Sequence, residues 1–531
     1  LKWIDNCPND LFSALTYQGG KYWRKNLLEV FSNDEGVINL IQSFNDQELN
    51  GLMTNLAGHD LESLEIGFSK YLNSDKPTCF ICYTVKGFGL PLAGHKDNHS
   101  GIMNNDQFHE YTKLMKIRKG QEWNKTEGIK VNDNELNTIV AANPLSKCNR
   151  EFSETVPIEQ LQTIKFNRLI STQEAFGKIM NEIGKVNNSF TKRIITTSPD
   201  VTVSTSLGGW VNKKNIFSTY KKTDVFGEKK VFSSQKWKYL PDGQHIELGI
   251  AENNLFLLLA SLGISDKLFG KRILPVGTIY DTFIGRGLDA LNYATYIDAR
   301  FILVGTPSGV TLSHEGGAHQ SILTPNIGIS QPNLKYYEPS YADELEFLFF
   351  WALEYMQKKE GSSMYFRLST KKLIQPERNL SQKNKQDILK GCYWLYKPKT
   401  SQPIILICTG VMIGEVEKLK EEITEEEIDI GILIATSPDQ LYSDWINSKN
   451  NNTSSHIEKI LDIYTRNTAI ITIIDGHSSS LAWIGSVLGH KVFPMGLNKF
   501  GQSGDLNEIY EYTNIDFKSI IDRIAKSIID K

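Results

Sequence analysis

The feature that most constrains the fold is an alternation of short apolar segments and helical patterns between residues 171 and 385. The apolar segments RIITTSPD, RILPVGTIYDTF, ARFILVGTPSG and SMYFRLST each run into a loop of small or polar residues. The helical pattern STQEAFGKIMNEIG, with a Ser/Thr cap signal, precedes the first of them. Strands that alternate with helices form parallel sheets. We therefore predict an α/β domain over 171–385.

Similar patterns flank this domain. Residues 386–531 contain the strand patterns PIILICTG, IDIGILIATS and TAIITIIDG, with VMIGEVEKLKEEI and IEKILDIYT as helices between them. Residues 1–125 carry helical patterns followed by an apolar strand pattern, TCFICYTV, at 78–85. Residues 126–170 are polar and irregular and are predicted to be a linker. The acidic run EEITEEEID is predicted to be a solvated helix end. The chain is expected to fold into successive parallel-sheet α/β domains.

Composition excludes several classes of function. A net charge of −3 gives no bulk attraction to nucleic acid or a membrane surface. Apolar runs stay well below the roughly 20 residues that span a bilayer. Six cysteines in 531 residues do not form a disulfide framework, so a reduced, cytoplasmic protein is expected. The C-x-x-C pair, Cys79 and Cys82, is predicted to be part of a strand core.

Several loops that follow predicted strands carry polar side chains suited to chemistry. In open α/β sheets, active groups lie at the carboxyl ends of strands. Such loops here are KGFGLPLAGHKDNHSG, SPDVTVST, IYDTFIGR and SHEGGAHQS. In HIELGIAENN, Glu252 lies at the start of the apolar helix pattern LFLLLASLG, which is predicted to be buried. The positive end of the helix dipole would partly offset the cost of a carboxylate there. A helix-capping glutamate is the alternative.

Together these motifs resemble the thiamine diphosphate-dependent transketolase superfamily. Within it they are most similar to the homodimeric type of pyruvate dehydrogenase decarboxylating component. NLAGHDLESL and YTVKGFG resemble the diphosphate-binding domain, GIAENN the glutamate motif of the pyrimidine domain, and FGQSGDLNEIY the C-terminal domain. GIAENN and SHEGGAHQS together are the most specific. The resemblance implies the carboxyl-terminal part of a diphosphate-binding domain, a linker, a pyrimidine-binding domain and a transketolase-like domain at 1–125, 126–170, 171–385 and 386–531.

The resemblance assigns roles around the cofactor, thiamine diphosphate. Glu252 would hydrogen-bond the far nitrogen of the cofactor's pyrimidine ring, so that the cofactor's own amino group can take up a proton. Tyr280 and Phe283 would form the aromatic slot for that ring, since stacking needs flat apolar faces; ordinary core aromatics are the alternative. Arg286 follows at a shorter spacing than the family's arginine and receives no role.

Three histidines resemble those of the family's reaction chamber. His319, His314 and His99 would bind the carboxylate of a 2-oxoacid and move protons during its breakdown and during acyl transfer. His95 could replace His99 in the alignment, so both remain candidates in that loop. A structural role is the alternative for each histidine.

The remaining calls follow from the same resemblance. Asp200 matches an acid near the substrate, with a turn residue as the alternative. Lys86 would approach the cofactor or lie on the surface. The family holds Mg²⁺ with a Gly-Asp-Gly segment and an Asn, and no Gly-Asp-Gly occurs in the sequence. These ligands are therefore expected upstream of residue 1. The chain, which starts with Leu, is expected to be a fragment that is inactive alone.

The expected activity is oxidative decarboxylation of pyruvate or a similar small 2-oxoacid, with transfer of the acyl group to a lipoyl group. The expected partners are a second copy of the chain, which completes the site in this superfamily, and a lipoyl-bearing acyltransferase component. Two alternatives remain open: a transketolase that transfers two-carbon ketol units, and a noncatalytic truncated subunit. The choice of 2-oxoacid depends on packing that the sequence does not reveal.

Overall fold

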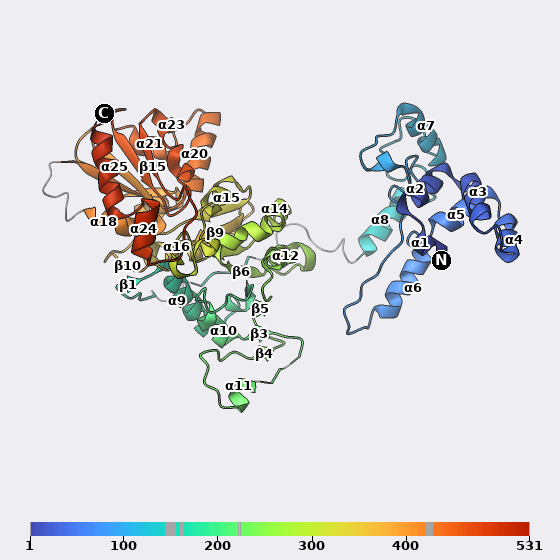
Figure 1. The fold of residues 1–531 in the computed structure, drawn as a ribbon, viewed down its shortest axis with the longest axis horizontal. Coiled ribbons are helices and arrows are strands. Elements are labelled where there is room, and N and C mark those ends of the chain that lie inside the picture. The colour runs from blue at the N-terminus through green and yellow to red at the C-terminus, as the bar shows by residue number, and fades with distance from the viewer. Residues whose placement is uncertain are drawn as a thin grey trace. The chain divides into compact units, whose positions relative to one another are not determined.

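The computed structural model describes residues 2–143, 155–159, 164–220, 222–223, 225–419 and 428–529. The chain divides into two compact units, 1–146 (unit 1) and 147–531 (unit 2) (Figure 1). Among the described helices, none combines the length and apolar character that a bilayer crossing requires.

Unit 1 is helical. Its first five helices surround a small core that includes Trp23, Leu27 and Leu49. Arg24 of α3 links α3 to the end of α4, because its guanidinium donates to the carbonyl oxygens of Ile41 and Phe44 at 2.7 and 2.6 Å. The helices are α1 (Lys2–Asn6), α2 (Asn9–Gln18), α3 (Gly20–Val30), α4 (Glu35–Ser43), α5 (Asp46–Thr54), α6 (Leu61–Tyr71), η1 (Lys96–His99), α7 (Asn105–Leu114) and α8 (Asp133–Ala142).

Two predictions for unit 1 are wrong. The segment 78–85 is no strand: it makes one isolated bridge, between Ala57 and Tyr83, and Ile81 is 82% exposed. Cys79 and Cys82 are exposed rather than part of a core. An apolar inner strand needs neighbours on both sides, and the described residues of unit 1 contain no other strand.

The predicted linker is also not wholly irregular. Helix α8 lies within its first part and begins with a capping box, in which Asn132 and Glu135 satisfy each other's backbone amides. This pair of polar residues adds to the loop-like composition of the segment, yet it is also a helix start signal. Residues 144–154 and 160–163 of the predicted linker lie outside the described residues.

Unit 2 contains a large parallel sheet, as predicted. Within the described residues its strand order is β4-β3-β5-β2-β6-β7-β9-β8, and every neighbouring pair is parallel. The strands are β2 (Ile194–Ser198), β3 (Ile216–Phe217), β4 (Tyr239–Leu240), β5 (His245–Glu247), β6 (Leu274–Ile279), β7 (Ile302–Gly305), β8 (Leu334–Tyr337) and β9 (Ser363–Arg367).

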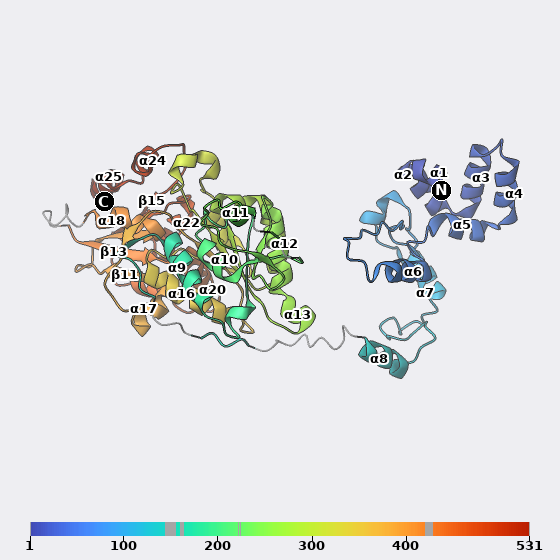
Figure 2. The same ribbon diagram turned by 90° about the horizontal axis from the view of Figure 1, so that it is seen from below.

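Helices cover both faces of this sheet. Side chains of β7 alternate between two hydrophobic clusters: Ile302 and Val304 join the cluster of α9, α10 and α16, whereas Leu303 joins that of α12 and α14. The covering helices are α9 (Thr172–Lys185), α10 (Gly208–Lys214), α12 (Glu252–Gly263), α14 (Leu288–Tyr296) and α16 (Ala342–Tyr355). Helices α9 and α10 lie side by side (Figure 1 and Figure 2). Ser171 caps α9 at its predicted start, with Glu174 completing the capping box.

A second sheet follows with order β11-β13-β12-β14-β15, in which only β11 is antiparallel. Its strands β12 (Ile404–Thr409), β13 (Ile430–Ala435) and β14 (Ala469–Ile473) confirm the three predicted strands; β11 (Cys392–Tyr396) and β15 (Val492–Met495) complete it. Its main helices are α18 (Ile413–Glu417), α20 (Pro438–Asn450), α21 (His456–Leu461), α22 (Ser479–Ala482), α23 (Gly485–Leu488), α24 (Leu506–Thr513) and α25 (Phe517–Ile529). Most of the run EEITEEEID lies outside the described residues.

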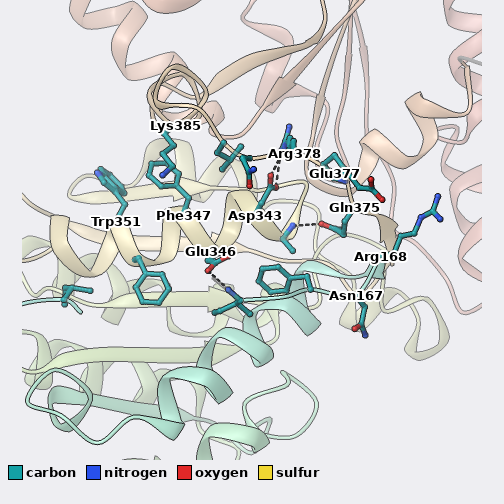
Figure 3. Close-up of a pocket in the computed structure, with 18 of the residues that line it drawn as sticks. Asn167, Arg168, Asp343, Glu346, Phe347, Trp351, Gln375, Glu377, Arg378 and Lys385 are labelled. Carbon is teal, nitrogen blue, oxygen red and sulfur yellow. Dashed lines mark hydrogen bonds and ion pairs between the residues drawn. The ribbon is translucent and has the colours of Figure 1, made fainter. Parts of the chain in front are cut away.

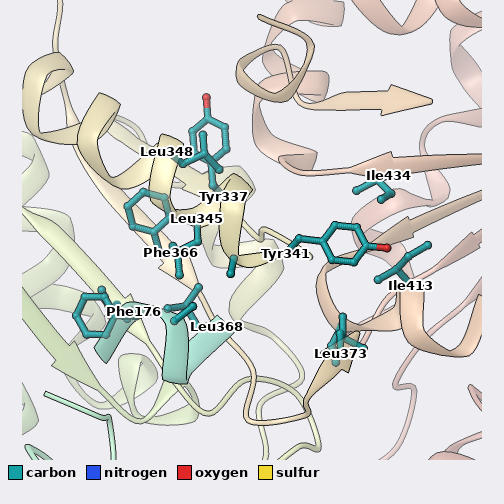
Figure 4. Packing of buried hydrophobic residues seen from close by; sticks show 14 of the residues in the cluster. Phe176, Tyr337, Tyr341, Leu345, Leu348, Phe366, Leu368, Leu373, Ile413 and Ile434 are labelled. Atoms are coloured by element: carbon teal, nitrogen blue, oxygen red, sulfur yellow. The ribbon is translucent and has the colours of Figure 1, made fainter. Parts of the chain in front are cut away.

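The two sheets of unit 2 share one hydrophobic core. Figure 4 shows Tyr341, at the start of α16, extending from the side of Leu345 and Phe366 towards Ile413 and Ile434 of the second sheet region. The remaining elements are β1 (Leu169–Ile170), β10 (Leu373–Ile374), η3 (Thr191–Arg193), α11 (Val225–Glu228), α13 (Ser265–Phe269), η4 (Asp281–Gly287), η5 (Ser313–Glu315), η6 (Gly317–His319), α15 (Thr324–Ser330), α17 (Gln382–Leu389) and η7 (Gly410–Met412). A continuous core makes unit 2 one packed body.

Helix α12 differs from its prediction. It was expected to be buried on nearly every face, and its inner face is, through Leu255, Phe256 and Leu259. The outer stripe is exposed, however, with Leu257 at 50%. Residues four apart lie on one helix face, so Asn253, Leu257 and Ser261 form this stripe.

Candidate functional site

The loops that carry the candidate residues of unit 2 lie at the carboxyl ends of strands of the large sheet. Strands β5, β2, β6 and β7 are consecutive neighbours in this parallel sheet, so their carboxyl ends lie side by side. The chain passes from β5 to β6 across β2, through α12. Open α/β sheets bind ligands at points where the strand order changes direction in this way.

Glu252 is the first residue of α12 and is only 9% exposed. Arg286 donates from Nη1 to Oε1 of Glu252, and the guanidinium carbon of Arg286 lies 3.6 Å from the centroid of the Phe283 ring. In the described part of the chain, Oε2 of Glu252 has no hydrogen-bond donor. No role is predicted for Arg286 from its spacing; the signal for one is its place in the loop after β6, close to both aromatic residues.

Three rings lie beside this ion pair. Tyr280 and Phe283 stack with centroids 6.0 Å apart and planes 24° apart. The His319 ring meets both edge-on, at 6.2 Å from Tyr280 and 5.3 Å from Phe283. Unit 2 therefore brings together one group of side chains, called the site cluster below: Glu252, Tyr280, Phe283, Arg286 and His319.

Two other candidates of unit 2 stand apart from the site cluster. Asp200 follows β2 with a left-handed φ of 63°, and its side chain is exposed. His314 is exposed in the loop after β7. The Asp200 amide donates to Oε1 of Glu247, at the end of β5, at 2.8 Å.

Glu247, at the end of β5, was missed by the sequence analysis. Its carboxylate accepts from the amides of Leu248 and Gly249 at 3.0 and 3.2 Å. Burial would raise the pKa of Glu247, but hydrogen bonds from His245, from the Asp200 amide and from Thr202 outweigh it and hold the pKa below its usual value. An ionised Glu247 thus orders the short segment that leads into Glu252.

The candidates of unit 1 lie in the loop 86–101. Lys86 Nζ and His99 Nδ1 are in hydrogen-bonding contact, and the side chain of Asn98 donates to the Lys86 carbonyl oxygen at 2.6 Å. His95 points elsewhere: its Nδ1 accepts from the Asp97 amide at 3.1 Å and its ring packs on Tyr17. Within unit 1, therefore, His99 rather than His95 is the partner of Lys86.

A buried charge cluster adjoins the site cluster through Asp281, which directly follows Tyr280 in the sequence. Arg367, at the end of β9, is fully buried and donates from Nε to Asp281 and from Nη1 to Glu338, both at 2.9 Å. Its Nη2 donates to the carbonyl oxygen of Asp475, at the end of β14, at 2.6 Å. Because Asp475 belongs to the second sheet, Arg367 joins the carboxyl ends of both sheets.

Asp475 is the weakly paired member of this cluster. Its Oδ1 accepts from the Val310 amide at 3.0 Å, while its Oδ2 is buried without a partner among the described residues. Burial raises the pKa of Asp475 to about 7, against the opposing effects of Arg367 and the Val310 hydrogen bond.

This pKa predicts a pH-dependent stability. From about pH 4 to about pH 7 the unfolded chain releases the Asp475 proton while the folded protein keeps it, so stability falls as pH rises and stays low above about pH 7. Asp475→Asn should therefore stabilise the protein relative to wild type by up to about 4 kcal/mol above pH 7, and far less near pH 4. Urea unfolding at several pH values measures this. A difference that is constant with pH would contradict it.

The site cluster suits an aromatic ligand ring that carries a nitrogen. Phe283 and Tyr280 offer ring faces, and Glu252 offers a free carboxylate oxygen. His319 Nδ1 is buried without a hydrogen-bond partner among the described residues, which leaves it available to a ligand. In the described ranges, no group of three or more His, Cys, Asp or Glu side chains is placed to hold a metal ion.

A separate cavity of about 770 Å³ lies against the outer face of α16 (Figure 3). Phe347 and Trp351 line it, and Arg378 is paired there with Asp343 at 2.7 Å. No member of the site cluster lines this cavity. Cavity size alone therefore does not point to the predicted site.

Comparison with known proteins gives a family and several relatives. Residues 159–373 match the family described as the pyruvate dehydrogenase E1 component middle domain. The pyruvate dehydrogenase E1 component of Pseudomonas aeruginosa is 23% identical over 408 residues, which cover 72% of this chain and 45% of that protein. A 1-deoxy-D-xylulose-5-phosphate synthase of Clostridium tetani is 23% identical over 370 residues, covering 68% and 50%. The chain spans about half the length of the curated relatives it matches.

Solved structures share the fold. A transketolase from Campylobacter jejuni has a TM-score of 0.63 at 15% identity, over 88% of this chain and 66% of that one. A transketolase from Leishmania mexicana has a TM-score of 0.62 at 16% identity, over 87% and 64%. At these identities the likeness concerns the arrangement of strands and helices.

Proposed function

Because the chain belongs to the transketolase-like superfamily of thiamine diphosphate-dependent enzymes, we propose that it serves in the oxidative decarboxylation of a small 2-oxoacid such as pyruvate. The bond between the carboxyl and keto carbons breaks and CO₂ leaves. The acyl group passes to one sulfur of a lipoyl disulfide, which is the oxidant and is reduced at the other sulfur. The observation that carries the proposal is the site cluster at the carboxyl ends of β5, β6 and β7.

The proposed cofactor is thiamine diphosphate, which when bound supplies an electron sink for cleavage of a bond next to a carbonyl group. Phe283 and Tyr280 would hold its pyrimidine ring by stacking. Glu252 would accept a hydrogen bond from the far ring nitrogen, and Arg286 would keep the Glu252 carboxylate in place. These residues concern the pyrimidine end of the cofactor alone.

His319 is the proposed proton carrier of this chain. Its edge-on contacts with two aromatic rings fix the ring orientation, and the exposed Glu315 carboxylate lies 3.6 Å from Nε2. Its free Nδ1 can bind the carboxylate of an oxoacid or move a proton to and from the substrate. Asp200 and His314, which are exposed and stand apart from the site cluster, remain proposals. Lys86 and His99, which contact each other in unit 1, remain proposals too.

A second copy of the chain is the proposed partner at this edge of unit 2. Helices α12 and α14 pack on each other and leave large apolar side chains on the surface. Exposed patches of this kind are typical of interfaces between subunits. The side chains are Leu257 of α12 and Tyr293 and Tyr296 of α14; Ile250, just before α12, is exposed as well. A lipoyl-bearing acyltransferase component remains the proposed acceptor.

The proposed function is tested with protein produced from its complete gene. With thiamine diphosphate and Mg²⁺ supplied, it should release CO₂ from pyruvate and acylate a lipoyl domain, and His319→Ala should slow this by about 100-fold because a positioned proton carrier is lost. Glu315→Ala, which removes only the exposed partner of His319, is the control and should retain most activity. Ketol transfer between sugar phosphates would replace the proposal with a transketolase; inactivity on every substrate would favour the noncatalytic subunit.

A further inference from the structure

The side chain between the two site aromatics on the η4 loop points away from the cluster and into the protein. Asp281 directly follows Tyr280 and precedes Phe283 by two residues, yet it is fully buried. Four donors surround its carboxylate, and a buried carboxylate with so many partners is held in one orientation. They are the hydroxyls of Ser321, Thr324 and Tyr365 and Nε of Arg367.

Two of these donors belong to the loop that carries His319. Ser321 lies two residues after His319, and Thr324, whose hydroxyl is 2.6 Å from Asp281 Oδ2, begins α15. The other two donors, Tyr365 and Arg367, come from β9 in the sheet. Asp281 therefore joins the aromatic loop to the histidine loop and fastens both to the sheet.

Ser321 also hydrogen-bonds Gly309, near the start of the histidine loop, which follows β7. Its hydroxyl accepts from the Gly309 amide at 2.8 Å, and its own amide donates to the Gly309 carbonyl oxygen at 2.9 Å. Gly309 has a φ of 57°, and a Cβ there would lie 2.1 Å from the Asp475 carboxyl group, so no larger residue fits. Gly309 and Ser321, on either side of His319, are thus held together.

We propose that Asp281 is a positioning residue that sets the distance and angle between the His319 ring and the Phe283–Tyr280 stack. This inference rests on the proposed function for its catalytic consequence, but its structural content does not depend on any ligand. A displacement of about 1 Å in a reacting group can cost about 100-fold in rate, so the link is needed for turnover even though Asp281 touches no substrate.

The test uses variants that cut the link at different points. Ser321→Ala removes the hydroxyl on the histidine loop, and Asp281→Asn weakens the acceptor on the aromatic loop. Glu338→Gln is the matched control, because Glu338 pairs with the same Arg367 and with Tyr336 but bonds neither loop. All three alter the same buried cluster, so a general loss of packing would affect them alike.

The first readout is the NMR signal of the His319 ring in protein with ¹³C-labelled histidine, assigned through His319→Gln. Ring currents of Phe283 and Tyr280 act on this ring at its present distance. Ser321→Ala and Asp281→Asn should move the signal towards the position of an exposed histidine, and Glu338→Gln should leave it in place. An unmoved signal in the first two variants, or an equal shift in all three, would overturn the proposal.

The second readout is kinetic. Ser321→Ala and Asp281→Asn should lower kcat by about 10- to 100-fold with little change in the KM for the oxoacid, because the substrate still binds while the proton carrier is misplaced. Normal kcat in both variants would overturn the catalytic part of the proposal. If the wild type is inactive on every 2-oxoacid, the proposed function fails, whereas the NMR shifts still decide whether Asp281 positions His319.

Discussion

Replacing Glu252 with glutamine is expected to lower kcat by at least about 100-fold while the protein keeps its fold. Glutamine has the same shape and its Oε1 can still accept from Arg286. It cannot, however, carry the negative charge that holds a proton on the ring nitrogen of the cofactor, and such proton transfers contribute about 10²- to 10⁴-fold. The measurement is steady-state decarboxylation, together with thermal melting and the Kd for thiamine diphosphate.

The control for this variant removes a carboxylate elsewhere in the same unit. Glu182 pairs with Lys185 near the end of α9, which precedes β2 and therefore lies at the opposite edge of the sheet from the site cluster. Glu182→Gln should leave kcat unchanged, because an exposed pair contributes at most about 1 kcal/mol to stability and nothing to the site. If Glu252→Gln turned over at the rate of Glu182→Gln, Glu252 would have no part in the chemistry.

The sheet of unit 2 was predictable because its strands are buried on both faces. Segments such as ILVG in β7 and LPVGTI in β6 are continuously apolar, and helices separate them, so both their type and their parallel pairing follow from the sequence. The short strands β3, β4, β5 and β8 were not predicted. Each has only two to four residues, too few to show a period.

Unit 1 shows the limit of the same reasoning. TCFICYTV has the composition of an inner strand, but an inner strand forms only where neighbouring strands are present to pair with it. With only the bridge between Ala57 and Tyr83, its backbone groups lack a ladder and the segment remains extended and exposed. A strand prediction therefore depends on partner segments as much as on its own residues.

Site residues were predictable where they stand in a recognisable loop motif. They were not predictable where the site depends on contacts between segments far apart in the sequence. Glu252, Phe283 and His319 stand in recognisable loops, and the structure places them together. Arg367 and Asp281 were not predictable, because a charged residue near the end of a strand pattern, as in SMYFRLST or IYDTFIGR, is more often a solvated strand end. Only the sheet order β6-β7-β9, which places the end of β9 one strand away from the end of β6, brings the two charges together.

Replacing Arg367 with methionine is expected to have the largest effect on stability. Methionine fills a similar volume, but Asp281 and Glu338 would then be left buried without a cation. Breaking a buried pair in this way costs about 3–5 kcal/mol. In a unit as large as 147–531 this corresponds to a fall in Tm of about 5 °C, measured by calorimetry.

Two further variants separate the missing charge from lost packing. Lys372→Met removes a cation from an exposed pair with Glu174 on the same unit and should change Tm by about 1 °C or less. Combining Arg367→Met with Asp281→Asn and Glu338→Gln should recover part of the lost stability, because the carboxylates that need a cation are then also neutral. If the triple variant melted lower than Arg367→Met alone, the cost would come from packing. Asp281 and Glu338 would then not depend on Arg367 for their burial, and the cluster would be a set of independent hydrogen bonds.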